Sequence, residues 1–256
     1  MSGISAGLWL LFAAGTFEPH SEVKLTPREI EVGAFYDGAK VRVEGATAPR
    51  SGVIIVFTGS DREERFKQKA RFGPFWMNAD RVRISGAPSL ILRFSSAPVA
   101  SLLSRDTIAR LHLDEASLTA RMQIEPPPDR AHDAVVRSAY LALKKSRGTY
   151  FFGDAGVSIR DSSDGCRAFA LEFHWPAKAA PEQYTMRVYQ VSEGKVIAEE
   201  CVPLLVARTG FPEWLAYLAS NRASLYGLTA VLISVLAGFG IDFVTTHLFG
   251  GKRVAH

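Results

Sequence analysis

Gly52–Thr58, with the sequence GVIIVFT, is the stretch that decides the fold of this 256-residue chain. The run from Gly52 to Phe57 contains no polar side chain, so neither of its faces is suited to water. A strand with one solvated face alternates apolar and polar residues, whereas a strand covered on both faces has a continuous apolar run. The sequence therefore predicts a central strand here, with packed layers on both sides.

Short alternating runs surround this strand between Val23 and Ser96. Successive side chains of a strand point to opposite faces, so such runs are typical of strands with one buried face. Turn-forming glycine and proline separate some of them, in Tyr36-Asp37-Gly38, Ala48-Pro49-Arg50 and Gly86-Ala87-Pro88. The pattern predicts an N-terminal β-sandwich module over residues 22–100, with further strands at 28–32, 40–44, 64–72, 80–84 and 89–95.

A linker over residues 101–148 follows this module, and three prolines at 126–128 make it the best internal boundary. Leu102–Leu113 has a weak pattern, helical or mixed. A stronger helix is predicted from Arg130 to Arg147, with Asp129 as its N-cap and Gly148 at its end. One face of this helix carries an apolar stripe of Val135, Val136, Ala139, Tyr140 and Leu143.

A second strand-rich region is predicted over residues 149–208. Its strands are expected at 157–159, 167–174, 184–191 and 195–206, and Ser192-Glu193-Gly194 joins the last two as a hairpin. About 60 residues are too few for a comfortable core alone, so we expect this module to pack on the preceding helix, with the first module as a further packing surface. The predicted class is mainly β, with two immunoglobulin-like sandwich modules and an intervening helix.

An uncharged stretch of 19 residues, ASLYGLTAVLISVLAGFGI, begins at Ala223. As a helix it would span about 28 Å, close to the hydrocarbon thickness of a bilayer. The sequence predicts a transmembrane helix over 223–249 and a cytoplasmic tail over 250–256. Residues 211–222 form an amphipathic juxtamembrane helix with Trp214 and Tyr217 suited to the headgroup layer, or else an ordinary surface helix that packs on the domain.

The N-terminal run from Ile4 to Ala14 has the length of a signal-peptide core, so residues 1–15 are a predicted signal peptide despite an n-region without Lys or Arg. Lys252 and Arg253 then stay on the cytoplasmic side. We expect an inner-membrane, single-pass protein with a periplasmic ectodomain. Cys166 and Cys201 could form a disulfide in that compartment, and two free buried thiols are the alternative.

Charge and motifs exclude several function classes. All but three basic and all but one acidic residue lie within residues 16–221, which leaves a net charge of +2 and no general case for binding nucleic acid. The chain has no GxSxG, GxxxxGK[ST], HExxH or paired CxxC motif. We therefore expect no enzyme activity, no cofactor and no metal site.

Six cations form the most suggestive local pattern. Arg65, Lys67, Lys69 and Arg71 fall on one face of a strand, opposite Phe66 and Phe72, while Arg81 and Arg83 alternate in the same way. If the two strands are neighbours, the six side chains share a sheet face that would attract an anion or an acidic partner. The alternative is a solvated face or a charged edge strand that discourages aggregation.

Small residues recur every fourth position in the predicted span, at Ala230, Ser234 and Gly238, and Asp242 continues the series. Such a face permits close approach of a second helix, with Asp242 able to bond across it. Alternatively, the small residues carry no partner and Asp242 only reaches the interface.

Several short segments resemble a known family. They are Phe75-Trp76-Met77-Asn78-Ala79-Asp80, Gly86-Ala87-Pro88-Ser89, Gly148-Thr149-Tyr150, Leu225-Tyr226-Gly227 and Ala237-Gly238. They resemble the putative transmembrane proteins of the alphaproteobacterial type, over about Val23 to Phe249. The resemblance implies a secreted β-rich body, one C-terminal helix and an accessory role beside a transporter of the sulfite-exporter class.

These expectations give two functional hypotheses. The first is a non-enzymatic accessory or scaffold protein, anchored in the bilayer by one helix and bound to an integral membrane partner. The second is a stand-alone periplasmic module that binds an anion or an envelope polymer through the cationic sheet face.

Overall fold

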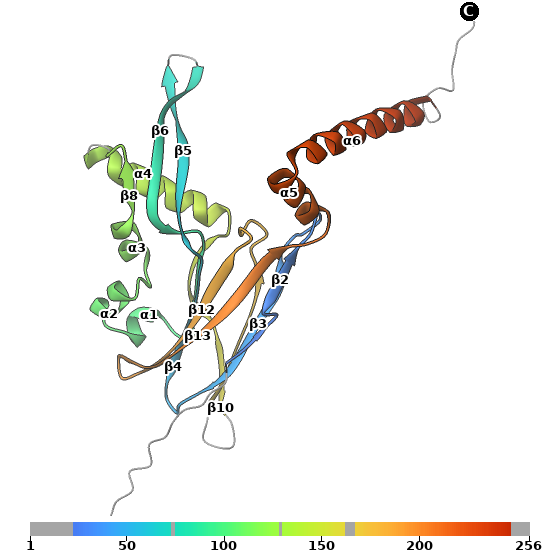
Figure 1. Ribbon diagram of the computed structural model, residues 1–256. Coiled ribbons are helices and arrows are strands. Elements are labelled where there is room, and N and C mark those ends of the chain that lie inside the picture. Colours follow the sequence, from blue (N-terminus) through green and yellow to red (C-terminus); the bar gives the residue numbers. More distant parts are fainter. Residues whose placement is uncertain (1–22, 73–74, 128–129, 162–166, 247–256) are drawn as a thin grey trace, which may run out of the picture.

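The computed structural model describes residues 23–72, 75–127, 130–161 and 167–246 (Figure 1). Its central strand is β4 (Gly52–Thr58), which pairs with β12 (Gln183–Ser192) on one side and β7 (Ile91–Ser95) on the other. Val53, Ile55 and Phe57 enter one apolar cluster, whereas Ile54 and Val56 enter a second. The prediction of a strand covered on both faces is confirmed.

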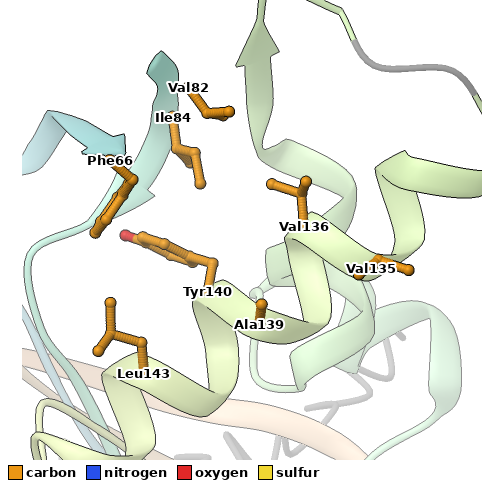
Figure 2. Close-up of a pocket in the computed structure, with 8 residues that line it drawn as sticks. All are labelled: Phe66, Val82, Ile84, Val135, Val136, Ala139, Tyr140 and Leu143. Atoms are coloured by element: carbon orange, nitrogen blue, oxygen red, sulfur yellow. The ribbon is translucent and has the colours of Figure 1, made fainter. Parts of the chain in front are cut away.

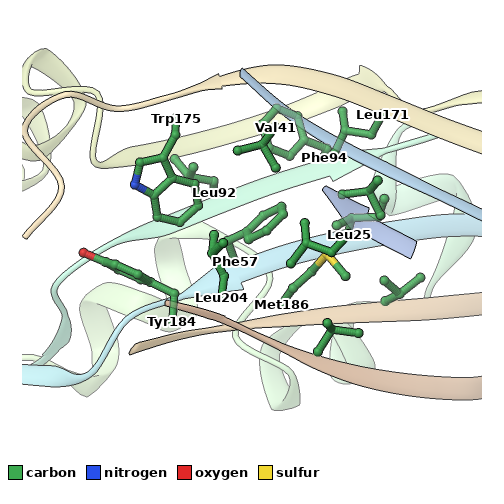
Figure 3. Packing of buried hydrophobic residues seen from close by; sticks show 14 of the residues in the cluster. Leu25, Val41, Phe57, Leu92, Phe94, Leu171, Trp175, Tyr184, Met186 and Leu204 are labelled. Carbon is green, nitrogen blue, oxygen red and sulfur yellow. The ribbon is translucent and has the colours of Figure 1, made fainter. Parts of the chain in front are cut away.

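Two sheets enclose the first cluster (Figure 3). Phe57 and Tyr184 contact the buried Trp175 edge-on, with ring centroids 5.6 and 4.9 Å away. The six-stranded sheet has the order β2 (Glu29–Val32), β13 (Lys195–Arg208), β12, β4, β7, β9 (Tyr150–Gly156). The four-stranded sheet has the order β1 (Lys24–Thr26), β3 (Ala39–Thr47), β11 (Arg167–Trp175), β10 (Ser158–Asp161).

The strands of the two predicted modules share these sheets. β11 pairs along β3, and β12 pairs along β4, so strands from both sides of the proline break alternate in space. This corrects the expectation of two separate sandwich modules, although the mainly β class is confirmed. The physical reason is burial: the strands of neither segment alone cover both faces of β4 and enclose a core of that size.

Helices cover the second cluster on the other face of the six-stranded sheet. They are α1 (Val99–Leu102), α2 (Arg105–Arg110), α3 (Glu115–Arg121) and α4 (Arg130–Ser146). Ser104 and Asp114 cap α2 and α3 by accepting bonds from Thr107 N and Ser117 N. The predicted cap Asp129 lies outside the described residues, and Gly148 ends the helical segment with a φ of +72°.

A long hairpin of β5 (Asp61–Phe72) and β6 (Phe75–Pro88) extends from this layer, and β8 (Gln123–Glu125) pairs with its base (Figure 1). The predicted turn at Gly86-Ala87-Pro88 is instead part of β6. A bulge lies there, between the pairs Arg62↔Ala87 and Glu64↔Ile84, with Gly86 at a φ of +74°. The bulge bends the strand without ending it.

Two helices follow β13: α5 (Phe211–Asn221), with Pro212 in its first turn, and α6 (Ala223–Val244). The 22 residues of α6 are long and apolar enough to cross a membrane, and none of them is buried in the chain. α6 extends away from the β-sandwich (Figure 1). The prediction of one C-terminal apolar helix is therefore confirmed as far as the described residues reach.

The strand directions define one end of the sandwich, which we call the α5 end. β13 runs toward it, and the parallel strand β2 ends there, because Val32 is paired with Arg208. β4 also ends there, since Thr58 is paired with Thr185 near the start of β12. The β5–β6 hairpin and the β2–β3 loop therefore both begin at the end of the sandwich that carries α5 and α6.

Candidate functional site

The cationic face of the hairpin is placed by backbone register. β5 and β6 are antiparallel neighbours, the condition under which the sequence predicted a shared cationic face, and Arg65 lies opposite Arg83 and Lys67 opposite Arg81. A register shift beyond Lys67 then puts Lys69 opposite Asn78 and Arg71 opposite Trp76. The side chains from Lys67 to Arg81 are outside the described part of the structure.

Carboxylates form ion pairs with Arg65 and Arg83, the two cations of this face whose side chains the structure describes. Glu63 Oε1 lies 3.1 Å from Arg65 Nε and 3.0 Å from Arg83 Nε, and Glu125 accepts from Arg83 Nη1 at 3.4 Å. These side chains are all at least 40% exposed, so each pair contributes less than about 1 kcal/mol to stability. At this end of the hairpin, the face is a mixed, solvated one rather than a purely cationic one.

The opposite face of the hairpin is apolar and lies over α4 (Figure 2). Phe66 contacts Tyr140 edge-on, with ring centroids 5.7 Å apart. A cavity of about 190 Å³ remains between the two elements, with the half-exposed Val135 at its border. Its lining is Phe66, Val82 and Ile84 from the hairpin with Val135, Val136, Ala139, Tyr140 and Leu143 from α4. The sequence predicted the stripe on α4, but not that the hairpin would face it.

A buried amine lies over the ring of Tyr140, one of the residues that line this cavity. Lys144 is only 4% exposed, forms an ion pair with Glu64 and donates to Ser89 O at 3.3 Å. Its Nζ also lies over the rings of Tyr140 and Tyr150, 5.4 and 5.5 Å from their centroids. Burial raises the pKa of Tyr140 to about 12, and burial also raises the pKa of Tyr150. The pair compensates the charges of Lys144 and Glu64 and holds α4 against the hairpin and the segment before β7.

A second polar cluster lies at the α5 end, around Glu182. Ser60 donates to its carboxylate at 2.5 Å, Ser89 donates to the other oxygen, and Arg62 Nη2 lies 2.8 Å away. Partial burial opposes ionisation of Glu182, but the two hydroxyls and the guanidinium outweigh it and lower its pKa. The cluster ties the loop before β12 to the segment between β4 and β5 and contains no histidine.

No group of three or more metal-ligating side chains occurs among the described residues. Cys201 is exposed on β13 and is bonded to no other described cysteine, so the alternative of two buried thiols is wrong for this residue. Its predicted partner Cys166 falls in 162–166, outside the described residues, so the disulfide stays a prediction.

The small-residue face of α6 is open. Ala230, Ser234, Gly238 and Asp242 lie on the exposed helix, and Ser234 Oγ donates to Ala230 O at 2.9 Å within it. A Cβ built at Gly238 would meet no atom within 4 Å. No described part of this chain therefore covers the face, and a second helix could approach it closely.

One comparison with known proteins found a relationship. A family model described as "Putative transmembrane protein (Alph_Pro_TM)" matches residues 21–247. No curated protein and no solved structure matches the chain.

Proposed function

Because the chain belongs to the Alph_Pro_TM family of putative transmembrane proteins, we propose that it is a single-span membrane protein whose β-rich ectodomain serves an integral membrane partner. In this proposal the protein is a non-enzymatic accessory or scaffold. Its ectodomain is periplasmic, and its C-terminus lies in the cytoplasm. A transporter of the sulfite-exporter class, which the family resemblance implies, is the first partner to test.

The observation that carries the proposal is the uncovered state of α6. An apolar helix of 22 residues with no buried residue would be strongly unfavourable in water, but it matches the thickness of a bilayer. The open face around Gly238 then gives a partner helix a place to pack.

Site-specific cross-linking from α6 tests the proposal. A photoactivatable residue replaces Ala230 in the full chain. The protein is irradiated in native membranes, and the cross-linked product is identified by mass spectrometry. We expect one stoichiometric polytopic protein, and we expect Gly238→Ile to weaken its recovery because a branched side chain separates the helices. Gly240→Ile is the matched control, since two residues along a helix point to nearly opposite faces.

Two results would contradict the proposal. One is cross-linking only to lipid or to random membrane proteins. The other is equal loss of the product in the Gly238 and Gly240 variants, which would show a general effect on the helix rather than a specific face.

The backbone register gives the second candidate, an anion-binding module, its own support. The backbone register pairs Arg65 with Arg83 and Lys67 with Arg81, and Glu63 and Glu125 offset the first of these pairs. In this case the full chain in detergent is monomeric and binds an anionic envelope polymer, and Lys67→Glu with Lys69→Glu abolishes the binding. Retained binding in the double variant would exclude the module.

A further inference from the structure

Phe35 is the most exposed large apolar side chain of the described ectodomain. Its side chain is 100% exposed and lies in a turn in which Tyr36 N donates to Gly33 O at 3.4 Å. Single exposed apolar residues are common on protein surfaces, so exposure alone carries no inference. The position of the turn in the fold makes this residue unusual.

The turn lies at the α5 end of the sandwich. It follows directly on β2, whose last residue Val32 is paired with Arg208. Thr209 N donates to Val32 O at 3.1 Å, and α5 begins at Phe211. Figure 1 shows the end of β2 beside the segment that leads from β13 into α5. Phe35 lies three residues after Val32, which is paired with Arg208, and α5 begins three residues after Arg208. The turn that carries Phe35 is therefore close to the start of α5.

The residues after Phe35 are held against the sandwich. Tyr36 packs on the first apolar cluster, between the two sheets, and burial raises the pKa of its hydroxyl. Gly38 has a φ of +106°, and a Cβ there would lie 2.8 Å from Trp175 O, so the backbone passes close to β11. The loop is thus fixed on its inner side, while the Phe35 ring points out into the surroundings.

We propose that Phe35 inserts into the headgroup layer of the membrane that α6 spans, as a second contact between ectodomain and bilayer. An aromatic ring is favoured at this depth, and α5 offers the exposed Trp214 and Tyr217 to the same layer. Two contacts on one end of the sandwich restrict how the ectodomain tilts about the link to α6. The inference rests on the proposed membrane span and goes beyond it.

Depth measurement on the full chain tests the inference. Cys166→Ser and Cys201→Ser remove the native thiols, Phe35→Cys carries a polarity-sensitive fluorophore, and the protein is reconstituted into phosphatidylethanolamine–phosphatidylglycerol vesicles. Lys195→Cys, at the exposed hairpin turn on the opposite end of the sandwich, is the matched control. We expect a blue shift and several-fold protection from an aqueous quencher at position 35, and neither change at position 195.

The outcomes separate the two proposals. Protein that floats with the vesicles and resists carbonate extraction, but whose position-35 label stays in water, overturns the Phe35 contact and leaves the span intact. Protein that fails to float overturns the span and the contact together. Equal blue shifts at positions 35 and 195 also overturn the contact, because they would show that the ectodomain binds lipid without orientation.

Discussion

Lys144 shows how a single residue fixes the contact between α4 and the sheet. Its ammonium group is almost fully buried and relies on Glu64 for its counter-charge and on Ser89 O for a further acceptor. Removing one partner of a buried pair is costly because the other charge is left without compensation. Lys145, its neighbour in sequence, instead pairs with Glu115 at the surface.

Glu64→Gln should therefore lower the free energy of unfolding by about 3 kcal/mol. Glu115→Gln, the matched control, should lower it by less than about 1 kcal/mol, because both members of its pair are more than 40% exposed. Urea unfolding of the detergent-solubilised protein, followed by near-UV circular dichroism, measures both values. Similar losses in the two variants would mean that burial of Lys144 does not set the cost.

The buried tyrosines make stability depend on alkaline pH. Burial raises the pKa of Tyr140 from 10.0 to about 12, so between these values the unfolded chain loses a proton that the native protein keeps. Stability should then fall as the pH rises from about 10 to about 12. Tyr140→Phe should make this fall shallower, measured as thermal midpoints at pH 9 and pH 11. A slope unchanged by the substitution would assign the effect to other groups.

Gly86 sets the geometry of one element, the β5–β6 hairpin. Its φ of +74° and the 2.6 Å that would separate a Cβ from Arg121 O combine backbone strain with a clash. Gly194, in the turn between β12 and β13, has a φ of +77° but open space around it. Alanine substitutions at these two glycines therefore separate the cost of backbone strain from the cost of the clash.

Gly194→Ala should destabilise the protein by about 1 kcal/mol through strain alone. Gly86→Ala should cost about 3 kcal/mol, since β6 must also move away from the carbonyl of Arg121. Thermal unfolding in detergent gives the two differences. Equal losses would show that the base of the hairpin yields easily, and that the bulge does not hold it in place.

The stripe on α4 and the run in β4 show what pattern reveals at the element scale. Each marked its element correctly, because periodicity depends on local geometry. The run in β4 is buried on both faces, whereas on α4 Tyr140 is buried and Val135 and Ala139 are exposed. The Gly86-Ala87-Pro88 signal predicted a turn, and the structure has a bulge within β6 instead. A glycine with positive φ is suited to a turn and to a bulge alike, so only the pairing of β6 with β5 shows which of the two is present.

The orientation of the whole molecule in its membrane can be tested through Cys201, which is exposed on β13. With a periplasmic ectodomain, a membrane-impermeant maleimide should label Cys201 in intact spheroplasts once an impermeant reductant has opened any disulfide to Cys166. Cys201→Ser is the control that removes this signal and leaves any contribution of Cys166. Labelling that appears only after the membrane is opened would place the ectodomain in the cytoplasm.

The sequence by itself determined the class of this protein: a β-rich body, a helix after the prolines, and one apolar C-terminal helix. These features depend on composition and on local periodicity, which can be read from each segment without knowing its neighbours in space. The tertiary structure decided which strands are neighbours. β11 and β12 pair with β3 and β4 from the other side of the proline break, since only together do they enclose one core. It also placed the end of β2, three residues before Phe35, beside the segment that leads into α5, and it opposed Arg65 to Arg83, because contacts between residues far apart in sequence depend on strand register and burial.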